Sequence, residues 1–395
     1  MFANLAARNL FSMQKILAGA FFDGQNWLAA GTCMLVKADG TITGFTSDTG
    51  GAITYEGIVC PGFVNAHCHL ELSAMRGAIP EHTGLPAFLK GVITNRTTPE
   101  PATIEQAITN ADAYMWQQGI NVVGDISNNA ITATRKQESR IHYHTFVEAL
   151  GFVPQTAAHQ LQLAQNTRQQ FLQHAQAATI VPHAPYSVST ALFEQIGALN
   201  EPVTSIHNQE TPAEDAFFRT GTGDFKAFYT FLGIDTSAFT PSGKSSLQTY
   251  WSAYAPQQHV LLVHNTFSTA GDIAFAQQQA AQVFWCLCPN ANLYIEQRLP
   301  DVPLLHRQHC TIVVGTDSLA SNHQLSILAE LQTLQQHFPG IPVATLLQWA
   351  TSNGARALKA DEQYGTLAVG KQPGIVWLKD ATPTDLSRAT VQRLF

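Results

Sequence analysis

Short apolar runs recur along the chain, and between about residues 58 and 335 a stretch of helical character follows each of them. A strand covered on both faces of a parallel sheet is continuously apolar rather than alternating. Eight such runs are present, and eight strand-helix repeats predict an α/β fold, a closed (β/α)8 barrel of the TIM type. The predicted strands are 58–67, 121–126, 142–150, 179–183, 203–207, 259–264, 282–288 and 311–317.

The pattern differs at the two ends of the chain. Residues 14–56 alternate short apolar runs with Asp-Gly and Gly-Gly turns, which are hairpin signals. A helix is predicted over 343–357, interrupted in its last turns by Asn353-Gly354, and short strands with turn glycines follow over 364–378. We therefore expect both ends to form one small β-sandwich-like domain. The predicted division is 14–56 and 359–395 for that domain and 57–358 for the barrel.

A long spacer, residues 220–256, separates the fifth and sixth predicted strands and is rich in Phe, Tyr and Trp. Loops of this length in a compact domain usually have a function or structure of their own. We expect helices over the barrel mouth. The pattern leaves open whether they form a substrate lid or only pack.

The composition of the chain favours some kinds of binding partner over others. Hydrophobic residues make up 45% of the chain and charged residues 12%, and the net charge of -7 argues against a nucleic-acid or anionic-membrane partner. A small-molecule substrate is expected instead. The six cysteines show no paired metal-site spacing and suit a reduced, cytoplasmic protein. No signal peptide or membrane span is recognised, and Met13 is an alternative start residue.

Two histidines one residue apart, His67 and His69, lie at the end of the first predicted strand. Side chains of an extended chain alternate between faces, so both imidazoles project to one side and Cys68 to the other. Two imidazoles on one side can bind one metal ion. For His-x-His alone, a surface or packing role is equally compatible with the sequence.

Further polar residues follow other predicted strands: His183, His207, His264 and Asp317. Each has an ordinary alternative, since a single histidine can be a hydrogen-bonded core residue and Asp317 can cap a helix. Glu210 and Glu214 can likewise form a solvated helix face. A barrel, however, gathers the carboxyl ends of all its strands at one mouth. Their joint occurrence therefore predicts a metal site, whereas Cys286 and Cys288 are expected in the core.

These strand ends, with Gly365-Thr-Leu-Ala-Val-Gly-Lys371 near the C-terminus, resemble the amidohydrolase superfamily. Within it they are similar to the mononuclear branch of cytosine, guanine and S-adenosylhomocysteine deaminases and chlorohydrolases. The resemblance covers most of the chain. It implies that one divalent cation, Zn²⁺ or alternatively Fe²⁺, is bound by His67, His69, His207 and Asp317.

The resemblance also implies catalytic roles. Water on the metal would become hydroxide near neutral pH, with Asp317 accepting its proton. His264 would orient that hydroxide, and Glu210 would shuttle protons to the ring nitrogen and the departing amine if a helical turn begins after His207. The implied reaction is hydrolytic deamination of an amino-substituted heteroaromatic ring.

The sequence determines the substrate less closely than it determines the reaction. The segment after His69 is similar to one in aminodeoxyfutalosine deaminases, which favours an adenine nucleoside, and the region 179–183 offers no lysine for a second metal. Hydrolysis of another C–N or C–Cl bond, or a non-catalytic metal-binding barrel, remains an alternative. Similar proteins commonly form dimers, so a homodimer is also open. The candidate substrate-binding residues are His183, Glu71, Arg76, Glu148, Tyr186 and Asn322.

Overall fold

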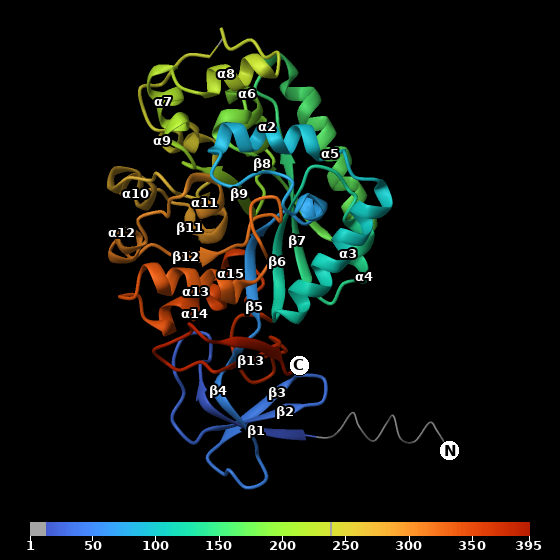
Figure 1. Cartoon of the computed structure of the whole chain (residues 1–395), viewed down its shortest axis with the longest axis vertical. Coiled ribbons are helices and arrows are strands. Elements are labelled where there is room, and N and C mark those ends of the chain that lie inside the picture. The colour runs from blue at the N-terminus through green and yellow to red at the C-terminus, as the bar shows by residue number, and fades with distance from the viewer. Residues whose placement is uncertain (1–12, 238) are drawn as a thin grey trace.

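Eight parallel strands surround one core in the computed structural model, which describes residues 13–237 and 239–395 (Figure 1). They are recorded as two four-stranded sheets, β5-β6-β7-β8 and β9-β10-β11-β12. Backbone hydrogen bonds cross both seams, because the His207 N–H donates to His183 and the N–H groups of Thr316 and Asp317 donate to His67. The strands are β5 (Phe63–Cys68), β6 (Ile120–Ser127), β7 (His142–Ala149), β8 (Ala177–Pro182), β9 (Val203–Asn208), β10 (His259–His264), β11 (Gln282–Leu287) and β12 (Ile312–Val314).

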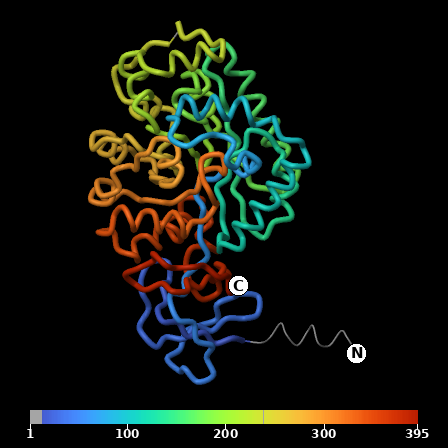
Figure 2. The backbone as a smooth tube through the Cα atoms, in the orientation of Figure 1, coloured from blue at the N-terminus to red at the C-terminus, as the bar shows by residue number. Residues whose placement is uncertain are grey.

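Helices follow the strands and cover the outside of the barrel, as the tube in Figure 2 also traces. The amidohydrolase-like (β/α)8 architecture expected from the sequence is therefore confirmed. The helices are α2 (Leu85–Asn95), α3 (Pro101–Gln117), α4 (Ala133–Glu138), α5 (Ala157–Gln173), α6 (Thr190–Gly197), α7 (Pro212–Thr220), α8 (Phe225–Phe231), α9 (Ser246–Tyr250), α10 (Ala270–Gln277), α11 (Pro289–Glu296), α12 (Val302–Arg307), α13 (Ile327–His337), α14 (Val343–Ala350) and α15 (Ser352–Ala357), with short 3-10 turns η1 (Leu70–Met75), η2 (Pro154–Thr156), η3 (Pro185–Ser187) and η4 (Trp251–Ala253).

The first predicted strand is in fact two strands in different sheets. The apolar run breaks at Gly62, between β4 (Ile53–Pro61) and β5. A Cβ atom at Gly62 would lie 1.9 Å from Oδ1 of Asn121, so a larger residue here would require the Asn121 side chain to move. Periodicity alone could not reveal the break, because both halves of the run are buried.

The described segments nearest the two ends of the chain, 13–61 and 375–395, meet in one small β unit beneath the barrel, as expected (Figure 1). Its strands form a six-stranded sheet in the order β14-β13-β4-β1-β2-β3. The predicted boundary at residue 57 falls inside β4. The remaining strands of this sheet are β1 (Met13–Phe21), β2 (Cys33–Lys37), β3 (Ile42–Thr46), β13 (Ile375–Lys379) and β14 (Thr390–Arg393).

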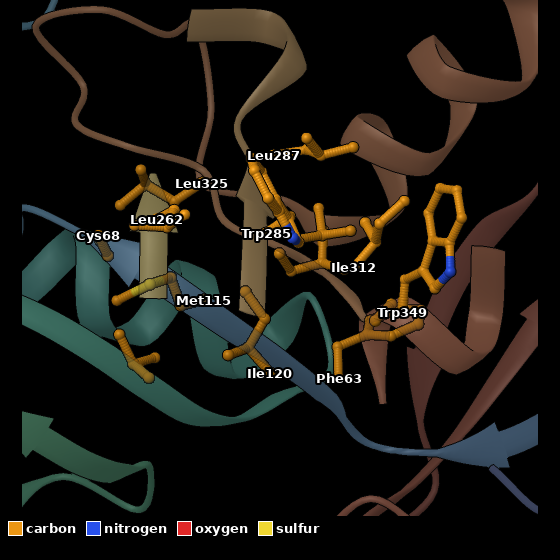
Figure 3. Packing of buried hydrophobic residues seen from close by; sticks show 14 of the residues in the cluster. Phe63, Cys68, Met115, Ile120, Leu262, Trp285, Leu287, Ile312, Leu325 and Trp349 are labelled. Carbon is orange, nitrogen blue, oxygen red and sulfur yellow. The ribbon is translucent and has the colours of Figure 1, made fainter. Parts of the chain in front are cut away.

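Two apolar layers position the strand ends. Outward-facing side chains such as Trp285 and Ile312 pack against helix residues such as Trp349 (Figure 3). A second cluster, including Val64, Phe146 and Cys286, fills the barrel interior. All six cysteines are free thiols, and Cys286 and Cys288 are core residues as predicted.

The predicted helix 343–357 is interrupted earlier than expected. It divides into α14 and α15 at Thr351, whose backbone angles (φ −128°, ψ −92°) are not helical. Asn353 and Gly354 lie within α15 instead. Among the described residues, no helix is long and apolar enough to cross a membrane.

Candidate metal centre and active site

His67 and His69 project to the same side of β5, as the alternation predicted, while Cys68 packs in the outer apolar layer. The pairing of β5 with β6 shifts register between Asn65 and Cys68. Such an irregularity re-aims side chains at the end of a strand. The Nε2 atoms of the two histidines lie 3.1 Å apart.

Four potential ligand atoms converge at the mouth of the barrel. Nε2 of His69 lies 3.2 Å from Nε2 of His207 and 3.3 Å from Oδ1 of Asp317. Nε2 of His67 lies 3.6 Å from the same carboxylate oxygen. The predicted convergence of side chains from β5, β9 and the turn after β12 is therefore present in the structure. His264 is also near, because His67, His207, His264 and Asp317 each offer an atom within 4.8 Å of the others.

Burial disfavours the charged form of His69, His207 and His264. Burial lowers the pKa of His69 to about 3 and that of His264 to about 4, and it lowers the pKa of His207 well below its usual range. Nδ1 of His207 donates to the carbonyl of His183 at 2.8 Å, since a carbonyl oxygen can only accept. The lone pair of His207 Nε2 therefore points into the cluster, as a metal ligand requires.

Asp317 is held in place by its own turn. Its backbone is left-handed (φ 56°), and its Oδ2 accepts a hydrogen bond from Ser321 at 2.6 Å, which leaves Oδ1 facing the imidazoles. Burial would raise the pKa of this carboxyl, but hydrogen bonding from His67 and the nearby imidazoles keep it well below its usual range. Asp317 does not cap a helix: the next helix, α13, is capped by Ser326.

The spacing of these atoms fits a divalent metal ion. In a tetrahedral site with metal–nitrogen distances of about 2.0–2.1 Å, neighbouring ligands are about 3.3–3.4 Å apart. The four separations of His67 and His69 given above, to each other and to His207 and Asp317, run from 3.1 to 3.6 Å. Lone pairs of neutral imidazoles this close repel one another unless a cation lies between them. Three nitrogens and one carboxylate oxygen are also the donor set that Zn²⁺ favours.

Glu210 lies beside the cluster without joining it. Its Oε1 accepts a hydrogen bond from the Tyr186 hydroxyl at 2.8 Å, and its Oε2 lies 3.4 Å from Nε2 of His264. Burial and the neighbouring Glu214 raise the pKa of Glu210 well above its usual range. This environment favours the protonated form of the carboxyl group, which suits a group that donates and accepts protons.

The backbone around Glu210 is a tight turn rather than the first turn of a helix. Helix α7 begins only at Pro212, and Gln209 has a left-handed backbone (φ 49°). The fully buried Glu214 accepts the N–H groups of Gln209 at 3.0 Å and Glu210 at 3.2 Å. The solvated helix face considered for these two glutamates is therefore wrong.

A cavity of about 410 Å³ opens beside this cluster. Of the predicted substrate-binding residues, Glu71, Glu148, His183 and Tyr186 line it, with Glu210 and His264. Oε1 of Glu148 is buried and accepts no hydrogen bond, and it lies 3.4 Å from Nδ1 of His207. The expected helices of the spacer are α8 and α9. Side chains of α8 both pack in an aromatic cluster and line the cavity.

Two predicted substrate-binding residues lie elsewhere. Arg76 is exposed and lines a separate groove with Tyr114 and Gln324. Asn322 is buried and donates to the Thr316 carbonyl at 2.9 Å and to Glu330 at 2.8 Å, so it braces the turn that carries Asp317. Proximity to a strand end suggested both residues, but it does not determine where a loop side chain points.

Sequence reasoning also missed a buried network behind the site. Arg96 donates to Glu71 and to Asn128, and Asn128 donates to Glu148. Arg96 lies at the end of α2, 27 residues after His69, and no spacing in the sequence relates it to the strand ends. Ser321 gave no signal either, and Glu214 was considered only as part of a helix face, because turns set the partners of both residues.

A (β/α)8 barrel with this cluster of imidazoles and a carboxylate at its mouth is the architecture of a metal-dependent hydrolase. Comparison with known proteins agrees. Residues 58–394 match the amidohydrolase family, and the chain belongs to it. It is therefore a hydrolase of the class that acts on carbon–nitrogen bonds.

Individual relatives show which members of the family the chain is similar to. The chain is 27% identical over 316 residues to an adenosine deaminase of Helicobacter pylori, a match that spans 76% of this chain and 74% of the relative. It superimposes with a TM-score of 0.78 on Helicobacter pylori aminofutalosine deaminase bound to methylthio-coformycin, at 22% identity over 97% of this chain and 100% of that chain. A zinc-bound adenosine deaminase of Xanthomonas campestris gives a TM-score of 0.73 at 21% identity, covering 96% and 90% of the two chains.

Proposed function

We propose that the protein is a hydrolytic deaminase that replaces the ring amino group of an adenine nucleoside by oxygen and releases ammonia. The observation that carries this proposal is Glu210: a buried carboxyl group beside the metal-type cluster, fixed by Tyr186 and left out of the ligand set. Deamination needs such a group, because a proton must reach the ring nitrogen and then the leaving amine. The curated adenosine deaminase relative supports the same reaction.

His67, His69, His207 and Asp317 are the proposed ligands of one divalent cation, Zn²⁺ in preference to Fe²⁺. The cation would supply Lewis acidity that makes a water molecule nucleophilic near neutral pH. The region at the end of β8 has no lysine to bridge a second ion, which supports a mononuclear site.

The proton transfers and the orientation of the attacking water are assigned to different residues around the proposed metal site. Asp317 is proposed to accept a proton from the attacking water through the carboxylate edge that faces the imidazoles. His264, whose Nδ1 lies 3.4 Å from Asn292 Oδ1, is proposed to orient that water. Glu210 then delivers its proton to the ring nitrogen, takes the proton of the newly attached hydroxyl group and passes it to the departing amine, and the proton held by Asp317 restores Glu210.

The nucleoside sugar is proposed to lie against Glu148. Its buried Oε1, which accepts no hydrogen bond from the protein, can accept sugar hydroxyl hydrogens, and Asn128 holds the other carboxyl oxygen at 2.7 Å. His183, which also lines the cavity, is fixed through Nδ1 by Ser187 at 2.6 Å and is proposed to contact the substrate rather than the metal.

Three further proposals concern the whole protein. The division into a barrel (57–358) and a terminal β unit (14–56 with 359–395) is supported by the two kinds of sheet. Six free cysteines support a reducing, cytoplasmic environment. A homodimer is proposed from the resemblance alone, and gel filtration with light scattering tests it.

The test is ammonia release from adenosine by protein loaded with Zn²⁺ or with Fe²⁺. Glu210→Gln should lower kcat by about 10²–10⁴-fold while leaving metal stoichiometry at one per chain. Removing the metal with a chelator should abolish turnover and lower the Tm, because a ligand that binds only the folded state stabilises it.

Two outcomes would contradict the proposal. Turnover of amides or chlorinated rings without any ammonia from nucleosides would retain the metal site but replace the reaction. Loss of metal in Glu210→Gln would place Glu210 among the ligands instead of beside them.

A further inference from the structure

The end of β5, which carries the two histidines of the metal-type cluster, is out of step with the neighbouring strand. Three residue steps on β5, from Asn65 to Cys68, are paired with two steps on β6, from Val123 to Asp125. β5 therefore holds one extra residue here, a β-bulge, which disrupts the ladder of backbone hydrogen bonds. A contact other than the ladder must then fix the direction in which the chain leaves the strand.

The side chain of Asp125 provides such a contact. Its Oδ1 accepts a hydrogen bond from the backbone N–H of Leu70 at 2.8 Å. Leu70 directly follows His69 and begins η1, so this bond fixes the peptide unit that leaves the proposed metal ligand. Asp125 and Leu70 are both fully buried. If the acceptor were lost, the N–H group would have no water to replace it.

A buried lysine holds the other oxygen of this carboxyl group. Nζ of Lys136, in α4, lies 2.6 Å from Oδ2 of Asp125, and neither side chain is exposed. The ammonium group also donates to Thr145 at 2.9 Å and to Ser127 at 3.2 Å, so three acceptors surround its three N–H bonds. Among the described residues, Lys136 is the only buried lysine or arginine.

The energetics of this buried pair favour a positioning role over a stabilising one. Two charges removed from water carry a large desolvation cost, and their replacement by apolar side chains is often neutral or stabilising. An apolar pair, however, would offer no acceptor to Leu70. Lys136 fixes Oδ2 of Asp125, and Oδ1 therefore faces the Leu70 N–H.

We propose that Asp125, held by Lys136, is a positioning residue for the metal centre. It acts through Leu70, fixing the backbone beside His69 and with it the direction of the His69 imidazole. The inference rests on the proposed metal site and adds to it two residues, from β6 and α4, that are not part of the cavity lining.

Two double variants separate the hydrogen bond to Leu70 from the ion pair. Asp125→Leu with Lys136→Met replaces both charges by apolar groups of similar size and removes the acceptor. Asp125→Asn with Lys136→Met also removes both charges, but the amide oxygen can still accept the Leu70 N–H. In a competition assay with a chromophoric chelator, the first variant should bind Zn²⁺ about 10–100-fold more weakly than the wild type. The second should bind it as tightly as the wild type.

The visible spectrum of the Co²⁺-loaded protein is the second readout, because it reports the coordination geometry and not the stability of the fold. It should change in the Asp125→Leu double variant and match the wild type in the Asp125→Asn double variant. Glu201→Leu with Arg168→Met is the matched control. Glu201 pairs with Arg168 at 2.8 Å and accepts the N–H of Ile180 at 3.3 Å, but it precedes β9 at the amino end of the barrel. This control should leave Zn²⁺ affinity and the Co²⁺ spectrum unchanged.

A backbone substitution tests the same bond with every side chain in place, and it serves also if the Asp125→Leu double variant does not fold. Replacing the Leu70 amide by an ester, with the hydroxy acid that corresponds to leucine, removes only the N–H and should weaken Zn²⁺ binding as that variant does.

Wild-type Zn²⁺ affinity in the ester protein or in the Asp125→Leu double variant would overturn the inference. Equal losses in the two double variants of Asp125 would also overturn it, because the ion pair would then carry the effect, and so would an equal loss in the control. A wild-type protein that binds no stoichiometric metal would overturn the proposed metal site and the inference with it.

Discussion

Some side chains of the site form hydrogen bonds to the atom of a proposed metal ligand that points away from the cluster, and so fix its orientation. Ser321 is the clearest, since it donates to Asp317 Oδ2 while Oδ1 faces the imidazoles. Partners of this kind orient metal ligands, and their loss typically costs about 10–100-fold in metal affinity.

Ser321→Ala should therefore weaken metal binding by about 10–100-fold in a competition assay with a chromophoric chelator. Ser326→Ala is the control, because Ser326 caps α13 and has no hydrogen bond to Asp317. It should lower stability but not metal affinity. Equal metal affinities in Ser321→Ala and the wild type would show that the turn holds Asp317 without this hydroxyl.

A buried histidine remote from the metal cluster makes stability depend on pH. Burial, with smaller effects of His142 and Lys136, lowers the pKa of His144 to about 4, and its ring contacts Thr179 Oγ1 at 3.1 Å. The unfolded chain binds a proton there below about pH 6.5, whereas the folded chain does so only near pH 4. The stabilisation that comes from His144 being neutral is therefore complete above pH 6.5, and it is lost as the pH falls towards 4.

His144→Gln should remove that part of the pH dependence and keep the bond to Thr179. Between pH 7.5 and pH 4.5, the wild type should lose more free energy of unfolding than the variant, by an amount on the order of 1–3 kcal/mol. Urea denaturation at the two pH values measures it. Parallel losses in the two proteins would mean that other buried groups carry the acid sensitivity.

At this scale the sequence predicted which strand-end side chains lie together, but not where the side chains of the surrounding loops point. His67, His69, His207 and Asp317 were found because strand ends converge wherever a barrel forms. Arg76 and Asn322 were misplaced because loop direction depends on contacts made by residues far along the chain, such as Glu330.

Among the elements, the loop between β9 and α7 links the carboxyl group of Glu210 to the spacer helices. Glu214, at the start of α7, accepts the N–H groups of Gln209 and Glu210 and also the hydroxyl of Ser246 from α9. It is a positioning residue for Glu210.

Glu214→Gln replaces one of its accepting oxygens with an amide and should loosen this turn. We expect kcat to fall by about tenfold with KM nearly unchanged, since the residue is not part of the cavity lining. Asp215→Asn on the same helix, where an exposed Asp215 pairs with Arg219, is the matched control and should keep kcat. A rise in KM at constant kcat would assign Glu214 to the binding of substrate.

Seven of the eight predicted barrel strands match single strands of the structure within a few residues, because two-sided burial leaves a clear apolar run. The run over 58–67 was divided instead by the packing of Gly62 against Asn121, a contact between residues 59 positions apart. The start of α7 was also predicted wrongly. A helical turn was expected directly after His207, but Gln209 has a left-handed backbone and the helix begins only at Pro212.

For the whole molecule, one side chain ties the small sheet to the barrel. Arg393 of β14 lies 3.5 Å from the centre of the Trp116 ring, and its guanidinium donates to the carbonyl groups of Trp116 and Ile120 and to Asn121. These partners belong to the end of α3 and the beginning of β6, at the base of the barrel.

Arg393→Ala should destabilise the protein by roughly 2–4 kcal/mol, because it leaves buried carbonyl groups without donors. Its kcat/KM should equal that of the wild type, since the cavity is at the other end of the strands. Arg388→Ala, an exposed arginine of the same terminal segment, is the control. A variant with wild-type stability in urea would show that β13 alone holds the two parts together.

The position of β4 also has a consequence for biosynthesis. Its sheet partner β13 follows 318 residues behind it, counted from Pro61 to Lys379. At about 5–20 residues per second, a ribosome needs roughly 15–60 s to supply that partner. During this interval one side of β4 is an open edge, the kind of surface on which nascent chains associate. A translation stop before residue 375 would make that exposure permanent, so such truncated products should aggregate or depend on chaperones even though all the metal ligands have been made.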